Sequence, residues 1–160
     1  MYQSGQFVHY LGFWEDWLGR DPYGYQRKTD KGISLPNVKE TMMTLYTVAE
    51  IFLFASRLAS DKFFDNTLHI SIQLKNTKNR KLIVDDFKRY LHGDYTCKYE
   101  PIKIEKDIPI NDILANSQEL SLQTTFEIFQ KFNWIIVGGW SDDFDCICCL
   151  AKKKGSDRLI

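Results

Sequence analysis

The chain has 160 residues, which is enough for one domain with a substantial core and short for two. Its 21 basic and 21 acidic side chains balance, so no overall field attracts phosphate backbones, acidic lipids or acidic substrates. This balance argues against a generally basic nucleic-acid-binding protein and leaves only a local basic patch for that role. We expect residues 1–160 to form a single domain.

The first predicted element is a helix over residues 5–19. Its apolar residues repeat at spacings of three and four: Phe7, Tyr10, Leu11, Trp14, Trp17 and Leu18. The aromatic stripe is larger than a small domain needs for its core: Phe7, Phe13, Trp14 and Trp17. It belongs either to the core or to an interface with a neighbouring domain or a second copy. Because aromatic sequence begins so soon after Met1, we expect the chain to be a portion of a larger protein.

Residues 20–36 are rich in Gly, Pro and charge and predict an exposed loop. A long helix is then predicted over Asn37–Ser60, apolar over so much of its circumference that it belongs inside the protein. Asn37 and Glu40 have the spacing of a capping box at its start. Glu50 and Arg57 lie two turns apart on this helix. Glu50 could be a base with a raised pKa in a dry site, but we favour a structural ion pair with Arg57, buried or at the rim.

The hydrophobic period changes from 3.6 to 2 after this helix. Leu68–Leu74 alternates apolar and polar residues and predicts a strand with one buried face. Turn residues at 76–79 and an apolar return at Arg80–Val84 predict an antiparallel hairpin. A third strand is predicted over Tyr95–Ile104, where Pro101 indicates an edge strand or a bulge.

The last clear pattern predicts one or two helices over Ile110–Phe132, with Asn116 and Glu119 spaced as a capping box. Weaker patterns follow, a short strand at Trp134–Val137 and a strand or helix at Asp145–Ala151. The order of periods predicts an α+β fold, in which a small antiparallel sheet packs on a layer of helices that includes one long central helix.

The cysteines indicate a reducing compartment. Cys146, Cys148 and Cys149 lie too close together in one extended segment to pair with each other, and Cys97 is far upstream. No signal peptide is recognisable, and no apolar run approaches the ~20 residues that cross a bilayer. We expect a cytoplasmic protein without a membrane contact.

No convincing catalytic, metal or cofactor site follows from the residue types, so we predict none. The cysteine cluster lacks the paired spacing of a zinc site, and the three histidines are scattered. No nucleophile elbow or phosphate-binding glycine loop is present in the sequence. A metal-dependent nuclease needs acidic groups for Mg²⁺ and a lysine beside the attacking water. Glu50, Asp65, Gln73 and Lys75 resemble that set only loosely, because Asp65 and Gln73 would lie on or beside the same strand.

Basic residues cluster around the predicted hairpin and the turn after it, with one tyrosine available for base stacking: Lys75, Lys78, Arg80, Lys81, Lys88, Arg89 and Tyr90. If these lie together, they form a small positive patch of the kind that binds nucleic acid. The alternative, which we favour, is a solvated surface, because the balanced net charge gives no long-range support.

Three stretches together resemble a known family: Ser4–Leu18, Leu45–Leu58 and Ile72–Asp86. They are similar to the region that follows the AlbA-like, schlafen-type DNA-binding domain in some bacterial proteins, and the similarity extends through Phe126–Trp134. The acidic, glycine-rich motif of the AlbA-like domain is absent from this chain. The resemblance therefore implies a non-catalytic companion domain, with a neighbouring AlbA-like domain as its partner.

Three functional hypotheses follow. The first is a cytoplasmic accessory or sensor domain that contacts a neighbouring domain, a second copy or another protein partner. The second is a nucleic-acid-binding module that uses the basic residues, and the third is a metal-dependent nuclease. Exposed aromatic residues in an apolar patch would favour the first hypothesis.

Overall fold

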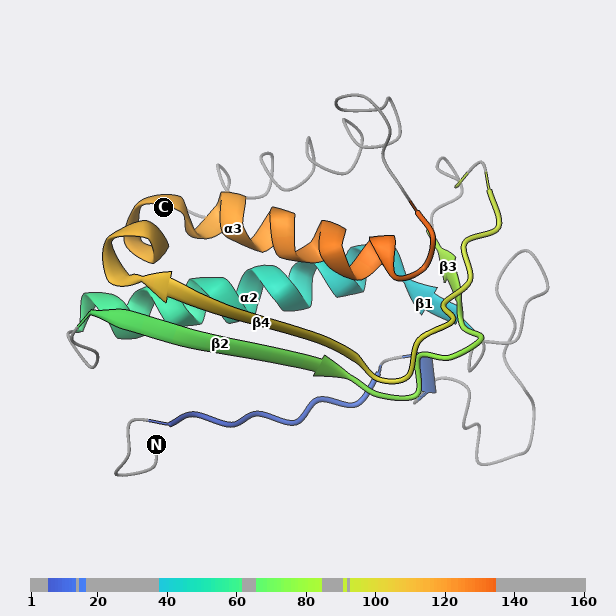
Figure 1. Ribbon diagram of the computed structural model, residues 1–160, viewed down its shortest axis with the longest axis horizontal. Coiled ribbons are helices and arrows are strands. Elements are labelled where there is room, and N and C mark those ends of the chain that lie inside the picture. Colours follow the sequence, from blue (N-terminus) through green and yellow to red (C-terminus); the bar gives the residue numbers. More distant parts are fainter. Residues whose placement is uncertain are drawn as a thin grey trace, which may run out of the picture.

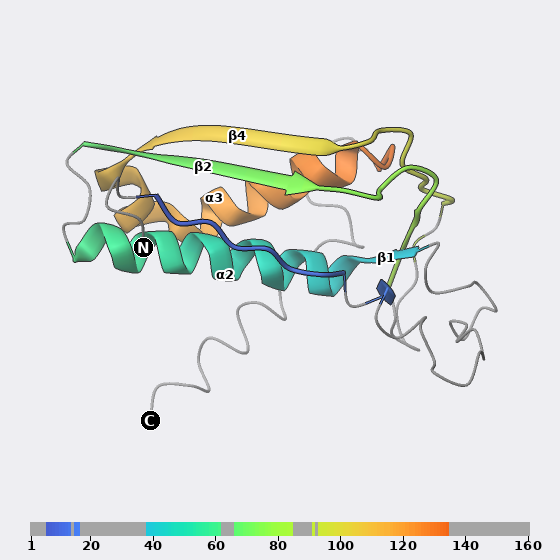
Figure 2. The same cartoon turned by 90° about the horizontal axis from the view of Figure 1, so that it is seen from below.

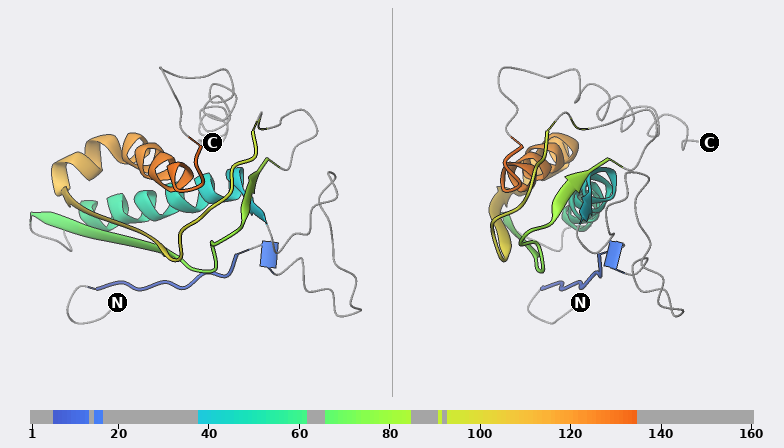
Figure 3. Two further views of the ribbon diagram at one scale, coloured as in Figure 1. Left: turned by 45° about the vertical axis from the view of Figure 1, so that its right-hand side comes forward. Right: turned by 90° about the vertical axis from the view of Figure 1, so that its right-hand side faces the viewer.

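The computed structural model describes residues 6–13, 15–16, 38–61, 66–84, 91 and 93–134. Its elements in chain order are β1 (Val38–Glu40), α2 (Thr41–Ser60), β2 (Thr67–Leu74), β3 (Lys81–Ile83), β4 (Ile102–Pro109) and α3 (Ile110–Gln130) (Figure 1). Helices α2 and α3 lie next to each other, and the β2–β4 sheet covers one side of them (Figure 3). This arrangement confirms the predicted α+β fold with a small antiparallel sheet on a helical layer.

Helix α2 is the predicted long central helix, but it begins four residues later than predicted. Val38–Glu40 forms strand β1 instead, and Glu40 is the N-cap, whose carboxylate accepts a hydrogen bond from the Met43 N–H. A carboxylate at this position satisfies one of the unpaired N–H groups of the first turn. Asn37, the other half of the predicted capping box, lies outside the described residues.

One face of α2 carries its buried residues, and the opposite face is exposed. The buried set is Thr41, Thr44, Leu45, Val48, Phe52, Ala55 and Ala59. Helix α2 is also long and apolar enough, by length and composition, to cross a membrane. This corrects the expectation that no apolar stretch of the chain is long enough to do so. A core helix of a soluble protein passes the same test, and the buried face of α2 packs in the core described here.

The predicted strand at Leu68–Leu74 is confirmed, but its predicted partner is wrong. Strand β2 pairs antiparallel with β4, with Leu68 opposite Ile108 and Leu74 opposite Ile102. Strand β3, within the predicted return strand, pairs in parallel with β1. Alternation identifies a strand without identifying its partner, because the partner is chosen by burial between distant parts of the chain.

The predicted hairpin turn at residues 76–79 is a bend within one arm of a longer hairpin. Beyond the bend, residues 79–82 pair with residues 95–97: the Cys97 N–H donates to the Arg80 carbonyl at 2.9 Å, and the Leu82 N–H donates to the Tyr95 carbonyl at 2.7 Å. The two arms therefore stay together from β2 and β4 to β3 and Thr96 (Figure 1). The predicted third strand is accordingly divided between the Thr96 bridge and β4, and the break falls at Pro101 as the phase of the pattern indicates.

Helix α3 follows β4 directly and is kinked at Asn116, where φ is −131° and ψ is 27°. The sequence left one or two helices open; the structure has one kinked helix, and the kink falls at Asn116, the first residue of the predicted capping box. Ile113, Ile128, Phe129 and Phe132 from this part of the chain are buried in the common core with α2 and the sheet, while Leu122 and Phe126 pack against it in part. Of the two weak elements predicted at the C-terminal end, only Trp134 is described, and it is buried.

Candidate interaction surface and a buried polar junction

The N-terminal segment is not the predicted helix where it is described. Residues 6–13 run without helical structure along α2, roughly in the direction of β2, and only Glu15 and Asp16 are helical (Figure 2). The apolar spacing of this stretch also fits an extended segment, in which Phe7, His9, Leu11 and Phe13 share one side. Periodicity does not separate the two conformations over so short a run, and Phe, Val and Tyr favour the extended one.

Most large side chains of this segment are exposed. Tyr10 is 88% exposed, Leu11 60%, Phe7 49% and Val8 43%. Phe7 packs on Phe54 of α2, with ring centroids 4.7 Å apart, and Leu53 and Phe54 are themselves partly exposed. We call the following set the apolar strip: Phe7, Val8, Tyr10, Leu11, Leu53 and Phe54. Large apolar side chains gathered in this way on a surface are typical of an interaction site.

Of the predicted aromatic interface, Phe7 belongs to the apolar strip and Phe13 does not. Phe13 is partly buried against the core, with the Lys39 ammonium 4.6 Å and the Arg80 guanidinium 4.9 Å from its ring centroid. Cations over an aromatic face are attracted by the negative potential of the ring. Phe13 therefore fixes the N-terminal segment to β1 and to the bend. Trp14 and Trp17 lie outside the described residues.

Glu15 and Asp16 complete a buried polar junction around Phe13. Glu15 is 1% exposed; it accepts hydrogen bonds from the Lys39 ammonium at 3.1 Å and from the Glu40 N–H at 2.6 Å. Asp16 accepts from the Arg80 guanidinium at 2.6 Å. The buried carboxylate and the two buried cations are thus paired across segments that are distant in sequence.

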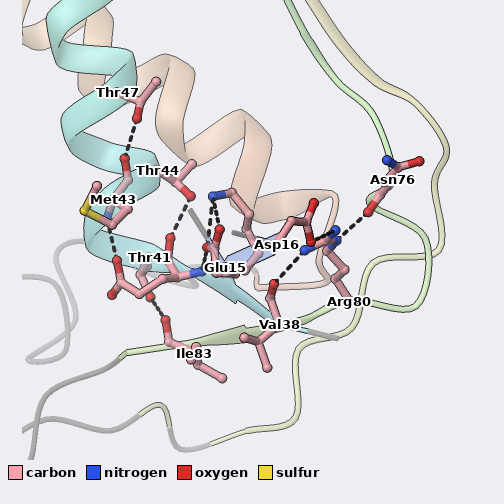
Figure 4. A network of polar contacts seen from close by, with 12 residues as sticks. Glu15, Asp16, Val38, Thr41, Met43, Thr44, Thr47, Asn76, Arg80 and Ile83 are labelled. Carbon is pink, nitrogen blue, oxygen red and sulfur yellow. Dashed lines mark hydrogen bonds and ion pairs between the residues drawn. The ribbon is translucent and has the colours of Figure 1, made fainter. Parts of the chain in front are cut away.

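Arg80 connects three parts of the chain at this junction. Besides Asp16, its guanidinium donates to the carbonyl oxygens of Val38, in β1, and of Asn76, in the bend (Figure 4). The planar fork of donors of an arginine suits this role, which the single ammonium of a lysine could not fill. Arg80 is 6% exposed, so this predicted nucleic-acid contact is a structural residue instead.

The polar side chains of the junction are fully paired within the described residues. Among the described residues, every buried side-chain nitrogen and oxygen has a hydrogen-bond partner. Within the same ranges there is no group of three or more His, Cys, Asp or Glu side chains that could hold a metal ion. A buried network that is fully satisfied acts by rigidifying the fold.

A second carboxylate organises the bend itself. Glu100 accepts hydrogen bonds from the N–H groups of Asn76 at 2.7 Å, Thr77 at 2.6 Å and Lys78 at 3.1 Å. These bonds, the one from Lys78 foremost, lower the pKa of the Glu100 carboxyl below its ordinary value of 4.5 because they stabilise the charged form. Consecutive backbone N–H groups that converge in this way form an anion-binding concavity, which Glu100 itself occupies.

The predicted basic patch is only partly present. Lys75 and Lys78 are exposed, whereas Lys81 forms an ion pair with Asp94 and Arg80 is buried. Lys88, Arg89 and Tyr90 lie outside the described residues. Only two of the four described cations of the prediction therefore present a free charge to solvent within the described structure.

Glu50 and Arg57 do not form a buried pair, because both side chains are exposed on α2. The helix begins at Thr41 and faces its apolar stripe toward α3 and the sheet, which leaves both charges on the solvent side. Gln73 lies on the exposed face of the sheet, opposite the face that packs on the helices. It therefore does not join Glu50 in a common site, and Asp65 lies outside the described residues.

The polar junction and the Glu100 contacts are what the sequence analysis missed. Glu15 and Asp16 fit the polar face of the predicted helix, and Lys39 and Glu40 fit the first turn of the next one. The sequence did contain one signal, the two asparagines Asn76 and Asn79, because asparagine often adopts positive φ in turns. In the structure their φ angles are 57° and 63°. That signal locates the bend but not the carboxylate that binds to it.

Comparisons with protein-family models, with curated proteins and with solved structures find no match to this chain. The resemblance to the region that follows AlbA-like domains therefore stays a prediction.

Proposed function

We propose that this domain is a non-catalytic interaction domain that docks on a protein partner through the apolar strip. The observation that carries the proposal is the exposure of four large apolar side chains, Phe7, Val8, Tyr10 and Leu11, on a segment anchored at Phe13, Glu15 and Asp16. The anchor fixes one end of the segment and the Phe7–Phe54 contact fixes the other, which favours this arrangement of the backbone before a partner arrives. Preorganisation of this kind reduces the entropy that binding costs.

The proposed setting is the cytoplasm, and a neighbouring AlbA-like domain is one candidate partner, as the resemblance implies. The apolar strip fits a partner protein whose surface is apolar at the centre and has a complementary polar rim. Tyr10 combines a large apolar ring with a hydroxyl, which is the type of side chain that dominates binding energy at interfaces.

A site-specific photo-cross-linker tests this proposal in the source cells. p-Benzoylphenylalanine replaces Tyr10 in one variant and Ser71, on the exposed face of β2, in the control. We expect a protein adduct from position 10 and none from position 71. Equal labelling from both positions, no protein adduct from position 10, or an adduct only with nucleic acid would contradict the proposal.

Nucleic-acid binding is the second candidate. The observation in its favour is the exposure of Lys75 and Lys78, three residues apart at the bend. Two lysines supply a weak electrostatic contact that salt would remove. We rank it below the interaction domain because the buried Arg80 and the paired Lys81 take no part in such a surface.

A further inference from the structure

The apolar strip includes a short extended segment that pairs with no strand among the described residues. Residues Gln6 to Gly12 make no backbone hydrogen bond within the part of the chain that the structure describes. The segment is rich in residues that favour strands, and it lies along one margin of the described molecule (Figure 1). An extended segment with free N–H and carbonyl groups is a ready template for pairing with another strand.

We infer that two copies of this chain associate by antiparallel pairing of this segment, with His9 of one copy opposite His9 of the other. This inference rests on the proposed function and names the partner as a second copy. A symmetric dimer requires that residue i face residue j and that j face i in return. Centring the pair on His9 places Phe7 opposite Leu11 and Val8 opposite Tyr10.

This register is selected by the side chains. In this register, each of the four exposed apolar residues of one copy lies opposite an exposed apolar residue of the other copy. Apolar cross-strand pairs of this kind stabilise a sheet. Centring on Val8 would oppose Phe7 to His9 and Tyr10 to Gln6. Centring on Tyr10 would oppose Val8 to Gly12 and Phe7 to Phe13, which is already held between Lys39 and Arg80.

Charge and area are both compatible with a second copy. Residues 6–13 carry no Asp, Glu, Lys or Arg, and the whole chain has a formal net charge of zero, so two copies bring no like charges together along the strand. From the exposed fractions and the sizes of such side chains, the strip presents on the order of 600 Å² per copy. A standard interface buries about 800 Å² per partner, and the strip with the paired backbone sets an upper limit near that size.

Sedimentation velocity of the purified chain over a micromolar concentration series is the first test, and we expect a monomer–dimer equilibrium. His9→Lys would place two like charges directly opposite each other and is expected to weaken self-association about fivefold. Ser71→Lys adds the same charge to an exposed position on β2 and is expected to leave it unchanged. A wild-type chain that stays monomeric throughout would overturn the inference without any variant.

Cysteine cross-linking tests the register. In a background with Cys146, Cys148 and Cys149 changed to Ser, only the buried Cys97 remains. After oxidation with diamide, His9→Cys is expected to form a disulfide-linked dimer. Leu11→Cys is not, because the two positions would lie about 13 Å apart along the strands, beyond the ~7 Å Cα reach of a disulfide. Circular dichroism of each variant establishes that it is folded.

The outcomes separate this inference from the proposed function. A dimer that links at position 9 and not at position 11 supports the pairing. A dimer that links at position 11 instead overturns it. A monomeric chain whose position 10 captures a different protein in cells leaves the proposed function standing and removes the second copy as its partner.

Discussion

Glu100 shows how one exposed carboxylate can shape the backbone of another segment. Its three hydrogen bonds to the N–H groups of residues 76–78 hold the bend between β2 and β3 against the opposite arm of the hairpin. Thr77, fully buried beneath it, donates from its hydroxyl to the Tyr99 carbonyl at 2.9 Å. The bend is therefore stabilised by contacts between the two arms and not only by the local preference of its asparagines.

The lowered pKa of Glu100 predicts a pH dependence of stability. Because the pKa is lower in the folded than in the unfolded chain, the contribution of this carboxylate is complete above about pH 4.5. It is lost as the pH falls from there through the lower folded pKa. We expect the Glu100→Gln variant to have a lower urea midpoint than the wild type at pH 7. Between pH 7 and pH 3, the urea midpoint of the variant is expected to fall less than that of the wild type.

Glu105→Gln is the matched control for that experiment. Glu105 is an exposed carboxylate on β4 that pairs with Lys103, and its removal is expected to change the urea midpoint at pH 7 very little. NMR titration of the Glu100 carboxyl gives its pKa directly. If Glu100→Gln and the wild type lose equal stability on acidification, the anion-binding role of the bend is refuted.

At the scale of elements, the polar junction explains how a three-residue parallel pair is maintained. Strands β1 and β3 are too short to be stable alone, and their register places Val38 opposite Lys81 and Glu40 opposite Ile83. The Thr41 hydroxyl donates to the Ile83 carbonyl at one end of the pair, and the Arg80 guanidinium donates to the Val38 carbonyl at the other, 3.2 Å away. Side chains thus extend the pairing beyond the ladder.

Removal of Arg80 is expected to be strongly destabilising. Arg80→Ala would leave the Asp16 carboxylate without its cation and the carbonyls of Val38 and Asn76 without a donor. Breaking a buried ion pair on one side costs about 3–5 kcal/mol, and urea unfolding measures the loss. Lys78→Ala, an exposed lysine two residues away, is expected to change stability by less than about 0.5 kcal/mol. Similar losses for the two variants would contradict the structural role of Arg80.

At the scale of the whole molecule, the core and the apolar strip have separate tasks. The core joins α2, α3 and the inner face of the β2–β4 sheet and contains the large buried residues Phe52, Phe129 and Phe132. The outer face of the sheet is polar, with pairs such as His69 and Asp107, whose facing atoms are 2.6 Å apart. The exposed apolar side chains are instead found mainly on the N-terminal segment and on the part of α2 that lies beside it.

The two leading hypotheses make opposite predictions about nucleic acid. We expect labelled single- and double-stranded DNA and RNA to show no salt-dependent change in fluorescence anisotropy with this chain, with or without Mg²⁺, because only Lys75 and Lys78 of the described patch are free. Binding that weakens steadily with salt, and that the double change Lys75→Glu and Lys78→Glu abolishes, would establish phosphate contacts and favour the second candidate. Probe cleavage with Mg²⁺ would instead favour a nuclease.

The sequence by itself determined the features that depend on neighbouring residues. The 3.6-residue period located α2 and α3, the two-residue period located β2, and Asn116 marked the kink, because each pattern reflects which side of a local element is buried. The exposed position of Lys75 and Lys78 likewise follows from polar residues in a turn.

Only the tertiary structure decided which segments meet. The pairing of β2 with β4 and of β1 with β3 joins segments that are far apart in the sequence. The extended form of residues 6–13 and the burial of Arg80 depend on the contacts of the junction, whose partners are 24 to 64 residues apart. A polar residue has the same local pattern whether it faces water or a buried partner of opposite charge. What separates the two cases is the free energy of burying both charged groups as a pair, and the spacing of residues within one segment contains no information about it.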